Sequence, residues 1–230
     1  MTFEYICKLY RLSTLQSVTR LAPGTTAQVW KLETDTGRYL LRTLRDRIQG
    51  ELEWTIFRSL PPALCPAIFP TADGAPAAEV EGVWHQLQEY LDGDMPDPSL
   101  PGMAAAMARA AKELSAHMPA GLIHGDLGPW NMVSTAQGLR VVDFGAAREG
   151  DPYFDFASLF GGVINHTPEG QRSQICGEFL RELDCDPARL LTQLELWTEE
   201  GISRWTGTSE KMVARFEHAL KWAKENLYEL

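Results

Sequence analysis

Short apolar runs separated by turn residues fill the first part of the chain. This alternation is typical of small antiparallel strands rather than of long helices. A hairpin turn, Asp35-Thr36-Gly37, separates two of the runs. We expect strands at residues 18–21, 27–32, 39–42 and 83–91.

One stretch in this part has helical spacing instead. Its apolar residues Leu52, Ile56 and Leu60 recur every four positions between residues 51 and 60, and Pro61-Pro62 ends the helix because proline cannot continue it. Residues 61–78, rich in Pro, Ala and Gly, predict a loop with at most one strand. The first part therefore predicts a small five-stranded lobe with one helix.

The pattern changes after residues 92–102, which contain three Pro and two Gly and predict a linker. Residues 102–117 are rich in Ala and Met, and three further helical stretches begin near Pro168, Pro187 and Ser209. The last stretch has one apolar face, which indicates core packing, formed by Met212, Phe216, Ala219, Ala223 and Leu227. We expect an α+β fold of two lobes, an N-lobe at 1–91 and a helical C-lobe at 92–230.

The composition is that of an ordinary globular protein, with 44% hydrophobic and 23% charged residues. No apolar run approaches the roughly 18 residues that cross a membrane, and the N-terminus lacks the charged-then-apolar order of a signal peptide. The four cysteines show no Cys-x-x-Cys spacing, which favours free thiols in a reducing compartment. We expect a cytoplasmic protein with no membrane partner, and the sequence leaves its oligomeric state open.

The net charge of −10 is unevenly distributed. Residues 1–91 carry 9 Lys and Arg against 10 Asp and Glu, whereas residues 92–230 carry 12 against 21. An acidic C-lobe argues against nucleic acid as a partner, because binding to phosphates needs a positive surface. The charge is either the solvated surface of ordinary helices or a field that favours a cationic ligand.

Two short motifs in the C-lobe carry the candidate chemistry. Residues 122–133 read LIHGDLGPWNMV and residues 141–145 read VVDFG. In the protein-kinase pattern H-R-D-x-x-x-x-N followed by D-F-G, the first Asp orients and deprotonates the attacking hydroxyl, and the Asn and the second Asp bind Mg²⁺. These roles fall on Asp126, Asn131 and Asp143, and Gly125 stands where protein kinases carry Arg.

Each motif alone has an ordinary structural explanation. A single Asp in a loop is most often a turn former or a helix cap, and an Asp-Phe-Gly turn is common at strand ends. Here the two motifs occur at the spacing of the kinase pattern, and each follows a short apolar run that predicts a buried strand. The combination therefore favours phosphoryl transfer.

With these motifs in this order, the chain resembles the aminoglycoside phosphotransferase family, which includes choline and homoserine kinases. The resemblance extends from about Val18 to the C-terminus and is most specific at residues 122–159. It implies a bilobal protein-kinase-like fold, with ATP and Mg²⁺ as cofactors and a small-molecule hydroxyl as acceptor. It also implies that His124 is a structural residue, and that Asp155 supports the catalytic loop from a helix start.

The resemblance implies a nucleotide-binding role for the N-lobe. Thr25 and Thr26, in a loop with a single Gly, would meet phosphate oxygens, and Arg42 stands where the family usually has Lys. Arg42 keeps the charge but presents a planar fork, so the exchange is not conservative. Its helix partner would be Glu53, with Glu51 as second choice. Lys31 is the alternative phosphate ligand.

The end of the last N-lobe strand is similar to the hinge between kinase lobes. Backbone groups of Glu89 and Leu91 would bind the adenine edge, and Val29, with Leu40 and a residue near Val142, would enclose the ring. Because hinge contacts are largely made by the backbone, the choice between ATP and GTP stays open.

Only eleven residues separate Asp143 from Asp155, and no Ala-Pro-Glu follows. Protein kinases need a long segment there to bind a peptide, so a small acceptor is favoured. The sequence thus predicts an ATP- and Mg²⁺-dependent phosphotransferase acting on an aminoglycoside, choline or homoserine-like hydroxyl. The rival interpretation is a nucleotide-binding, pseudokinase-like module without catalysis, and a protein kinase is the third.

Overall fold

The computed structural model describes residues 3–21 and 27–230, in two compact units, Met1–Asp92 and Gly93–Leu230. The N-terminal unit is built on a six-stranded antiparallel sheet in which β1, β2, β3, β6 and β4 follow one another and β5 also pairs with β6. The strands are β1 Leu15–Arg20, β2 Val29–Thr34, β3 Arg38–Leu44, β4 Ile68–Phe69, β5 Ala78–Val80 and β6 Val83–Glu89. The prediction of five strands was therefore one strand short.

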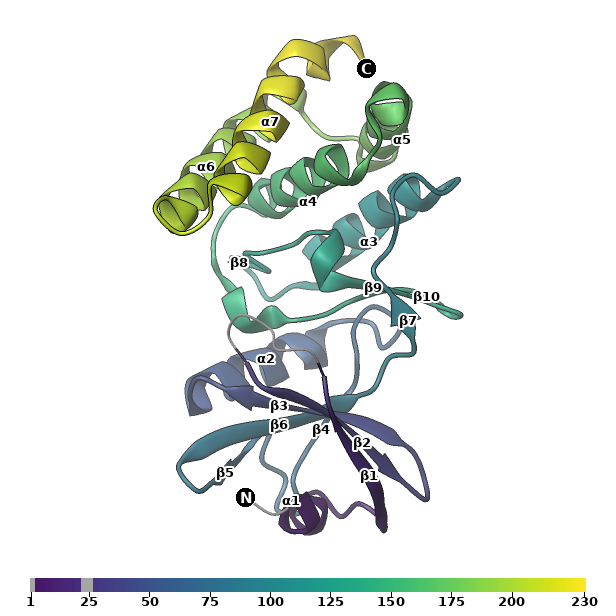
Figure 1. The fold of residues 1–230 in the computed structure, drawn as a ribbon, viewed down its shortest axis with the longest axis vertical. Coiled ribbons are helices and arrows are strands. Elements are labelled where there is room, and N and C mark those ends of the chain that lie inside the picture. The colour runs from purple at the N-terminus through teal and green to yellow at the C-terminus, as the bar shows by residue number, and fades with distance from the viewer. Residues whose placement is uncertain (1–2, 22–26) are drawn as a thin grey trace. The chain divides into compact units, whose positions relative to one another are not determined.

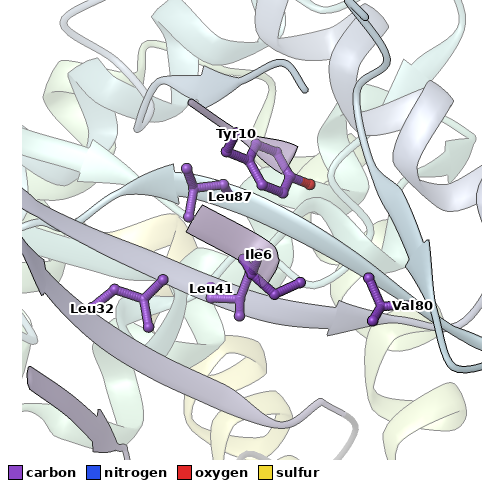
Figure 2. Packing of buried hydrophobic residues seen from close by; sticks show 6 residues of the cluster. All are labelled: Ile6, Tyr10, Leu32, Leu41, Val80 and Leu87. Atoms are coloured by element: carbon purple, nitrogen blue, oxygen red, sulfur yellow. The ribbon is translucent and has the colours of Figure 1, made fainter. Parts of the chain in front are cut away.

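Two helices, α1 (Phe3–Leu9) and α2 (Arg47–Ser59), lie on opposite faces of this sheet (Figure 1). The face under α1 is apolar and holds the unit's core cluster, Ile6, Tyr10, Leu32, Leu41, Val80 and Leu87 (Figure 2). The sequence did not predict α1, because seven residues are too few to show a helical period. Its stability comes from packing, since Ile6 is fully buried.

Helix α2 begins four residues earlier than its apolar spacing indicated. Asp46 caps it: the Asp46 side chain accepts a hydrogen bond from the Gln49 backbone N–H at 2.8 Å. The helix ends at Ser59, and Leu60 is its C-cap, directly before Pro61. The extra first turn matters for the candidate site, because it brings Gln49 onto the buried side of the helix.

The C-terminal unit places short strands beside a helical core. Strand β7 (Gly93–Asp94) pairs with β9 (Met132–Thr135), which pairs with β10 (Gly138–Val141), and β8 (Leu122–Ile123) pairs with β11 (Arg148–Glu149). The helices are α3 Met103–His117, α4 Pro152–His166, α5 Arg172–Leu183, α6 Pro187–Trp205 and α7 Glu210–Asn226. Single 3-10 turns complete the unit, namely η1 Pro129–Asn131, η2 Phe144–Ala146, η3 Glu169–Gln171 and η4 Leu227–Glu229.

Helix α4 is the centre of this core and contacts α3, α5, α6 and α7 (Figure 1). Eleven of its fifteen residues are buried, so it is apolar on nearly every side. The predicted apolar face of α7 is buried at Phe216, Ala219 and Ala223, as expected for a packing surface. In the described residues, no helix combines the length and the hydropathy that crossing a membrane requires.

Candidate active site

The candidate catalytic loop runs from His124 to Asn131, between strand β8 and strand β9. Within it, Asn131 folds back onto Asp126. The Asn131 Nδ2 atom donates to the Asp126 backbone oxygen at 2.8 Å and to the Asp126 Oδ2 atom at 3.1 Å. Because both bonds use the amide nitrogen of Asn131, its side-chain oxygen stays available as a hard ligand for a cation.

Asp155, in the first turn of α4, holds the backbone of this loop in place through its carboxylate. Its two carboxylate oxygens accept the backbone N–H groups of His124 at 2.7 Å and of Gly125 at 2.9 Å. Burial raises the pKa of Asp155, while His124 and the two backbone donors oppose that rise. The supporting position predicted for Asp155 is thus present in the structure.

His124 connects the loop to the second motif. It is fully buried, its Nδ1 accepts the Asp126 backbone N–H at 3.3 Å, and its Nε2 lies 3.0 Å from the Val142 backbone oxygen. A carbonyl can only accept, so Nε2 carries the proton and Nδ1 does not. Both ring nitrogens are therefore engaged, which fits the structural role expected for His124.

Asp143 lies next to Asn131 along the backbone ladder, because the Val142 N–H donates to the Asn131 oxygen at 3.0 Å. Asp143 has a left-handed backbone (φ 63°), caps the 3-10 turn η2 through the Gly145 N–H, and is exposed. The two oxygen donors predicted for a metal, Asn131 and Asp143, thus belong to adjoining segments. No group of three or more His, Cys, Asp or Glu in the described part of the chain is arranged to hold a metal.

Asp126 is half-buried, and burial raises the pKa of its carboxyl group. The charges of His124 and Arg204 and the nearby Trp130 and Asn131 side chains each lower this pKa in part. A carboxylate that is partly desolvated and held by the Asn131 amide has the character of a positioned general base.

In the N-terminal unit, Arg42 of β3 and Glu53 of α2 form a buried ion pair. The Arg42 Nη2 atom donates to Glu53 Oε1 at 2.9 Å, and the side chains are only 7% and 2% exposed. The predicted partner Glu53 is therefore the one that pairs, whereas Glu51 is exposed and pairs with Arg47.

Lys31, the alternative phosphate ligand, has different contacts. Its Nζ lies 2.8 Å from Glu33 on the same strand and 5.5 Å from the centre of the Tyr90 ring. Val29 lies opposite Arg42 in the β2–β3 ladder. Thr25 and Thr26 lie outside the residues that the structure describes.

The predicted hinge residues lie at the end of β6, whose last residue is Glu89. The Glu89 N–H donates to the Ala67 oxygen at 2.8 Å, and the Glu89 carboxylate accepts the Ala67 N–H at 3.1 Å. This pair of bonds fixes the position of Glu89, and Leu91 follows it half-buried.

A family model for the phosphotransferase enzyme family matches residues 56–197, more than half of the chain. The chain belongs to this family. The match covers α3, the catalytic loop, the Asp143 segment and α4, so it rests on the elements that build the C-terminal site. The predicted family and the prediction of a phosphotransferase enzyme are thereby confirmed.

Solved structures share the fold at low sequence identity. One is a microcompartment-associated aminopropanol kinase, at 16% identity, with a TM-score of 0.67 and 93% of each chain covered. Another is an aminoglycoside phosphotransferase in ternary complex with ADP and hygromycin B, at 13% identity, with a TM-score of 0.70 and 97% of each chain covered. An amicoumacin kinase in complex with AMP-PNP, Ca²⁺ and its ligand matches at 14% identity and a TM-score of 0.65, over 97% of this chain and 92% of its own.

These likenesses confirm the predicted kinase-like fold. A comparison with curated protein sequences finds no match.

Two residues of the site were not identified from the sequence. Gln49 donates from Nε2 to Glu53 Oε1 at 2.7 Å and accepts the Arg45 backbone N–H at 2.9 Å, so it joins α2 to the end of β3. Trp130, next to Asn131 in the same loop, places its ring centre 6.3 Å from that of His166 on α4. Neither contact follows from spacing. The sequence signal for Trp130 was only its place inside the catalytic motif.

Proposed function

We propose that this phosphotransferase uses ATP and Mg²⁺ and transfers the γ-phosphate to the hydroxyl of a small molecule. The observation that carries the proposal is the arrangement around Asn131. Its side chain is bonded to Asp126, and its backbone is bonded to the residue before Asp143. A base and two hard oxygen donors in adjoining segments are the groups that phosphoryl transfer needs.

In this mechanism Asp126 accepts the proton of the acceptor hydroxyl. The hydroxyl oxygen forms a bond to the γ-phosphorus while the bond from phosphorus to the bridging oxygen breaks, and ADP leaves with that electron pair. Burial raises the pKa of the Asp126 carboxyl above its ordinary value, which favours proton acceptance by this carboxylate.

Asn131 Oδ1 and the Asp143 carboxylate are the groups that would hold Mg²⁺. Both are oxygen donors, the ligand type this ion prefers, and two protein ligands are typical of a site where phosphates and water complete the shell. When bound, the ion neutralises the charge on the phosphates.

The N-terminal unit (residues 1–92) is the proposed nucleotide-binding lobe. Arg42 would contact phosphates, oriented by Glu53, with Thr25 and Thr26 as further phosphate contacts. Val29 would contact the base, and backbone groups of Glu89 and Leu91 would bind its edge. The Arg42–Glu53 pair supports Arg42 over Lys31, because its buried carboxylate on α2 fixes the Arg42 side chain, whereas the carboxylate that pairs with Lys31 is 37% exposed.

The proposed acceptor is a small hydroxyl compound, of the aminoglycoside, choline or homoserine type, and an ammonium group on it is favoured by the acidic C-terminal part. Aminopropanol, amicoumacin and hygromycin B, named with the structural relatives, are rational first candidates. The ten residues from Gly93 to Gly102 leave little room for an inserted acceptor domain, so the pocket would come mainly from the C-terminal helices. The four cysteines are free thiols, which supports the cytoplasm as the proposed compartment.

A nucleotide-binding module without catalysis is the second candidate, favoured by Arg42 in the place of the usual Lys. The deciding experiment is ATP turnover with and without a panel of amino alcohols, sugars and aminoglycosides. Product formation supports the enzyme, whereas tight binding of Mg-ATP with no product from any compound supports the module.

Two variants then separate the roles in the C-terminal unit. Asp126→Asn should keep the fold and nucleotide affinity but lower kcat by roughly 10²-fold or more, because it removes the positioned base. Asp143→Ala should instead weaken Mg-ATP binding itself. Wild-type turnover by Asp126→Asn, with acceptor present, would contradict the role of Asp126.

A further inference from the structure

A cavity of about 350 Å³ lies in the N-terminal unit, beside the start of α2. Its volume is within the range of cavities that hold small organic ligands. Its walls come from the end of α1, the start of α2, the loop before β5, and the strands β5 and β6. The lining includes none of the described residues that we propose for nucleotide binding, so the cavity is a separate feature of this unit.

The loop that forms one wall is held in a fixed shape by hydrogen bonds. The Thr71 N–H donates to the Ala75 oxygen at 2.8 Å, and the Thr71 hydroxyl donates to the Asp73 carboxylate. The Ala72 N–H donates to the Leu9 oxygen at 2.6 Å, which joins the loop to the end of α1. This wall therefore has a defined position, and a ligand does not have to order it on binding.

Part of the lining is apolar and includes the indole ring of Trp84. Trp84, on β6, is half-buried and lies opposite Glu79 in the β5–β6 ladder, so the two side chains are on the same face of the sheet. Leu9, Pro76 and Ala77 add further apolar surface. An indole ring attracts both flat apolar groups and cations.

The charged residues of the lining are mostly acidic. Three carboxylates against the one guanidinium of Arg47 leave a net charge of −2. Arg47 pairs with Glu51 at 3.4 Å, whereas Asp73 and Glu79 are exposed carboxylates. The hydrogen bond from the Thr71 hydroxyl lowers the pKa of Asp73, which keeps this carboxyl group charged at neutral pH. The charge of the lining therefore favours a cation.

The cavity and the Arg42–Glu53 ion pair lie on opposite sides of α2. Arg47 and Glu51 line the cavity. Gln49 and Glu53, each two residues further along, are buried and bonded to each other at 2.7 Å. Two residues correspond to a rotation of about 200° around a helix. A ligand that contacts Arg47 and Glu51 therefore restrains the same part of the helix that positions Gln49.

We infer that this cavity binds a small organic cation, an ammonium group joined to a flat apolar body, and that the bound cation strengthens ATP binding through α2. The ammonium group is attracted by Asp73 and Glu79, and the apolar body packs against Trp84. Restraint of the first turn of α2 holds Gln49 and the Arg42 side chain in place before ATP binds, which removes part of the cost of ordering them. The effect on ATP rests on the proposed function, whereas binding of the cation does not.

Phenethylamine is a suitable probe, because it has an ammonium group and a phenyl ring but no hydroxyl that could be phosphorylated. The indole ¹⁵N–¹H signal of Trp84 is identified among those of the seven tryptophans by its loss in Trp84→Phe. Phenethylamine should shift this signal, whereas hydrocinnamate, which carries the opposite charge, should not. Glu79→Gln should raise the dissociation constant of phenethylamine about two- to fivefold. Glu4→Gln, an exposed acid of α1 outside the cavity, is the matched control and should leave it unchanged.

The effect on α2 has two readouts, of which only one requires ATP. The Gln49 N–H donates to the Asp46 cap, so its hydrogen exchange should slow at least about threefold in saturating phenethylamine. The dissociation constant of Mg-ATP should fall at least about threefold, and ATP should tighten phenethylamine binding by the same factor, because such coupling is reciprocal. Trp84→Ala should abolish both effects and leave the affinity for ATP without phenethylamine unchanged.

These measurements separate the ligand site from the proposed function. Should Mg-ATP fail to bind, the proposed nucleotide-binding role is wrong, and a shift of the Trp84 signal with slower exchange at Gln49 still supports the site and its effect on α2. A Trp84 shift without slower exchange at Gln49, or with no change in the affinity for Mg-ATP that does bind, would overturn the coupling. No Trp84 shift with phenethylamine, or an equal shift with hydrocinnamate, would overturn the site and leave the kinase proposal standing.

Discussion

Gly125 occupies a position where both the backbone and a close neighbour exclude a side chain. Its φ is 79°, in the left-handed region, and a Cβ atom would lie 2.3 Å from the Ala146 backbone oxygen. Protein kinases carry Arg at this point of the motif. In this chain the approach of the Asp143 segment to the catalytic loop requires Gly, and the N–H of Gly125 is also one of the two donors to Asp155.

Gly125→Ala should therefore be costly, and Gly121→Ala is its matched control. Gly121 has a similar φ of 82°, but a Cβ there would meet nothing within 4 Å. We expect Gly121→Ala to lower the free energy of unfolding by about 1–2 kcal/mol, the cost of a left-handed Ala. Gly125→Ala should lower it by at least ~2 kcal/mol more, because the neighbouring atom belongs to the backbone, and it should also reduce kcat by displacing Asp126.

Urea unfolding and steady-state turnover of both variants measure these effects. Equal losses of stability in the two variants would show that the Ala146 segment gives way at no cost, and would remove the close approach as the reason for Gly125.

At the scale of elements, α2 is joined to strand β3 by more than the ion pair between Arg42 and Glu53. Gln49 Nε2 and Arg42 Nη2 both donate to Glu53 Oε1, while Gln49 Oε1 accepts the backbone N–H of Arg45 just after the strand. The end of β3, the start of α2 and the Arg42–Glu53 ion pair are thus joined in one hydrogen-bond network. Removing one member of such a network leaves its partners without a hydrogen bond, which costs about 1–3 kcal/mol.

This network allows a direct test of whether Arg42 or Lys31 binds the phosphates. Arg42→Ala should raise the apparent KM for ATP or lower kcat by about tenfold or more, because it removes the proposed phosphate contact and leaves Glu53 buried without its cation. Arg42→Lys should retain much of the activity, since Gln49 still holds Glu53 in place. Lys31→Ala should stay within about threefold of wild type, because an exposed pair with Glu33 contributes little.

Initial rates over a range of ATP concentrations, with unfolding measured in parallel, separate loss of function from loss of fold. If Lys31→Ala were inactive and Arg42→Ala behaved like wild type, the phosphate ligand would be Lys31.

The strands and helices differ in how well the sequence predicted them, for physical reasons. Strands β1, β2, β3 and β6 were located to within a few residues, because their alternation and the turn at 35–37 are local signals, whereas the short strands β4 and β5 were not located. Helix α1 has no such signal and depends on burying Ile6 and Tyr10 against the sheet. The first turn of α2 depends on the Asp46 cap, which the apolar spacing does not include.

The residues of the candidate site also divide into those that the sequence predicted and those that it did not. Asp126, Asn131 and Asp143 were found because their chemistry requires fixed spacing within two short segments. Gln49 and Trp130 act through contacts that exist only after the chain has folded, so spacing could not reveal them. The pairing of Arg42 with Glu53 was predictable only as an implication of the family resemblance, and its role with nucleotide stays a prediction.

At the scale of the whole molecule, the acidic excess of residues 92–230 is the strongest global feature, but the structure offsets part of it near the site. Asp151 pairs with Arg189 at 2.8 Å, Asp155 is bound by backbone N–H groups, and Arg204 is close enough to Asp126 to lower its pKa. Three of the four aspartates between residues 126 and 155 therefore contribute less field than the sequence suggests. A preference for cationic acceptors should exist but be modest.

We expect a hydroxyl acceptor with an ammonium group to have a higher kcat/KM than a neutral compound of the same shape, by no more than about tenfold. This limit corresponds to roughly 1 kcal/mol for an exposed charge contact. Aminopropanol and propanediol are a matched pair, and a neutral cyclitol with its amino analogue is a second.

The preference should shrink with salt, because the Debye length falls from ~10 Å at 0.1 M to ~3 Å at 1 M. Competition assays at both salt concentrations measure this preference. A neutral or anionic acceptor that outcompetes its cationic match, or a preference insensitive to salt, would show that shape rather than charge selects the acceptor.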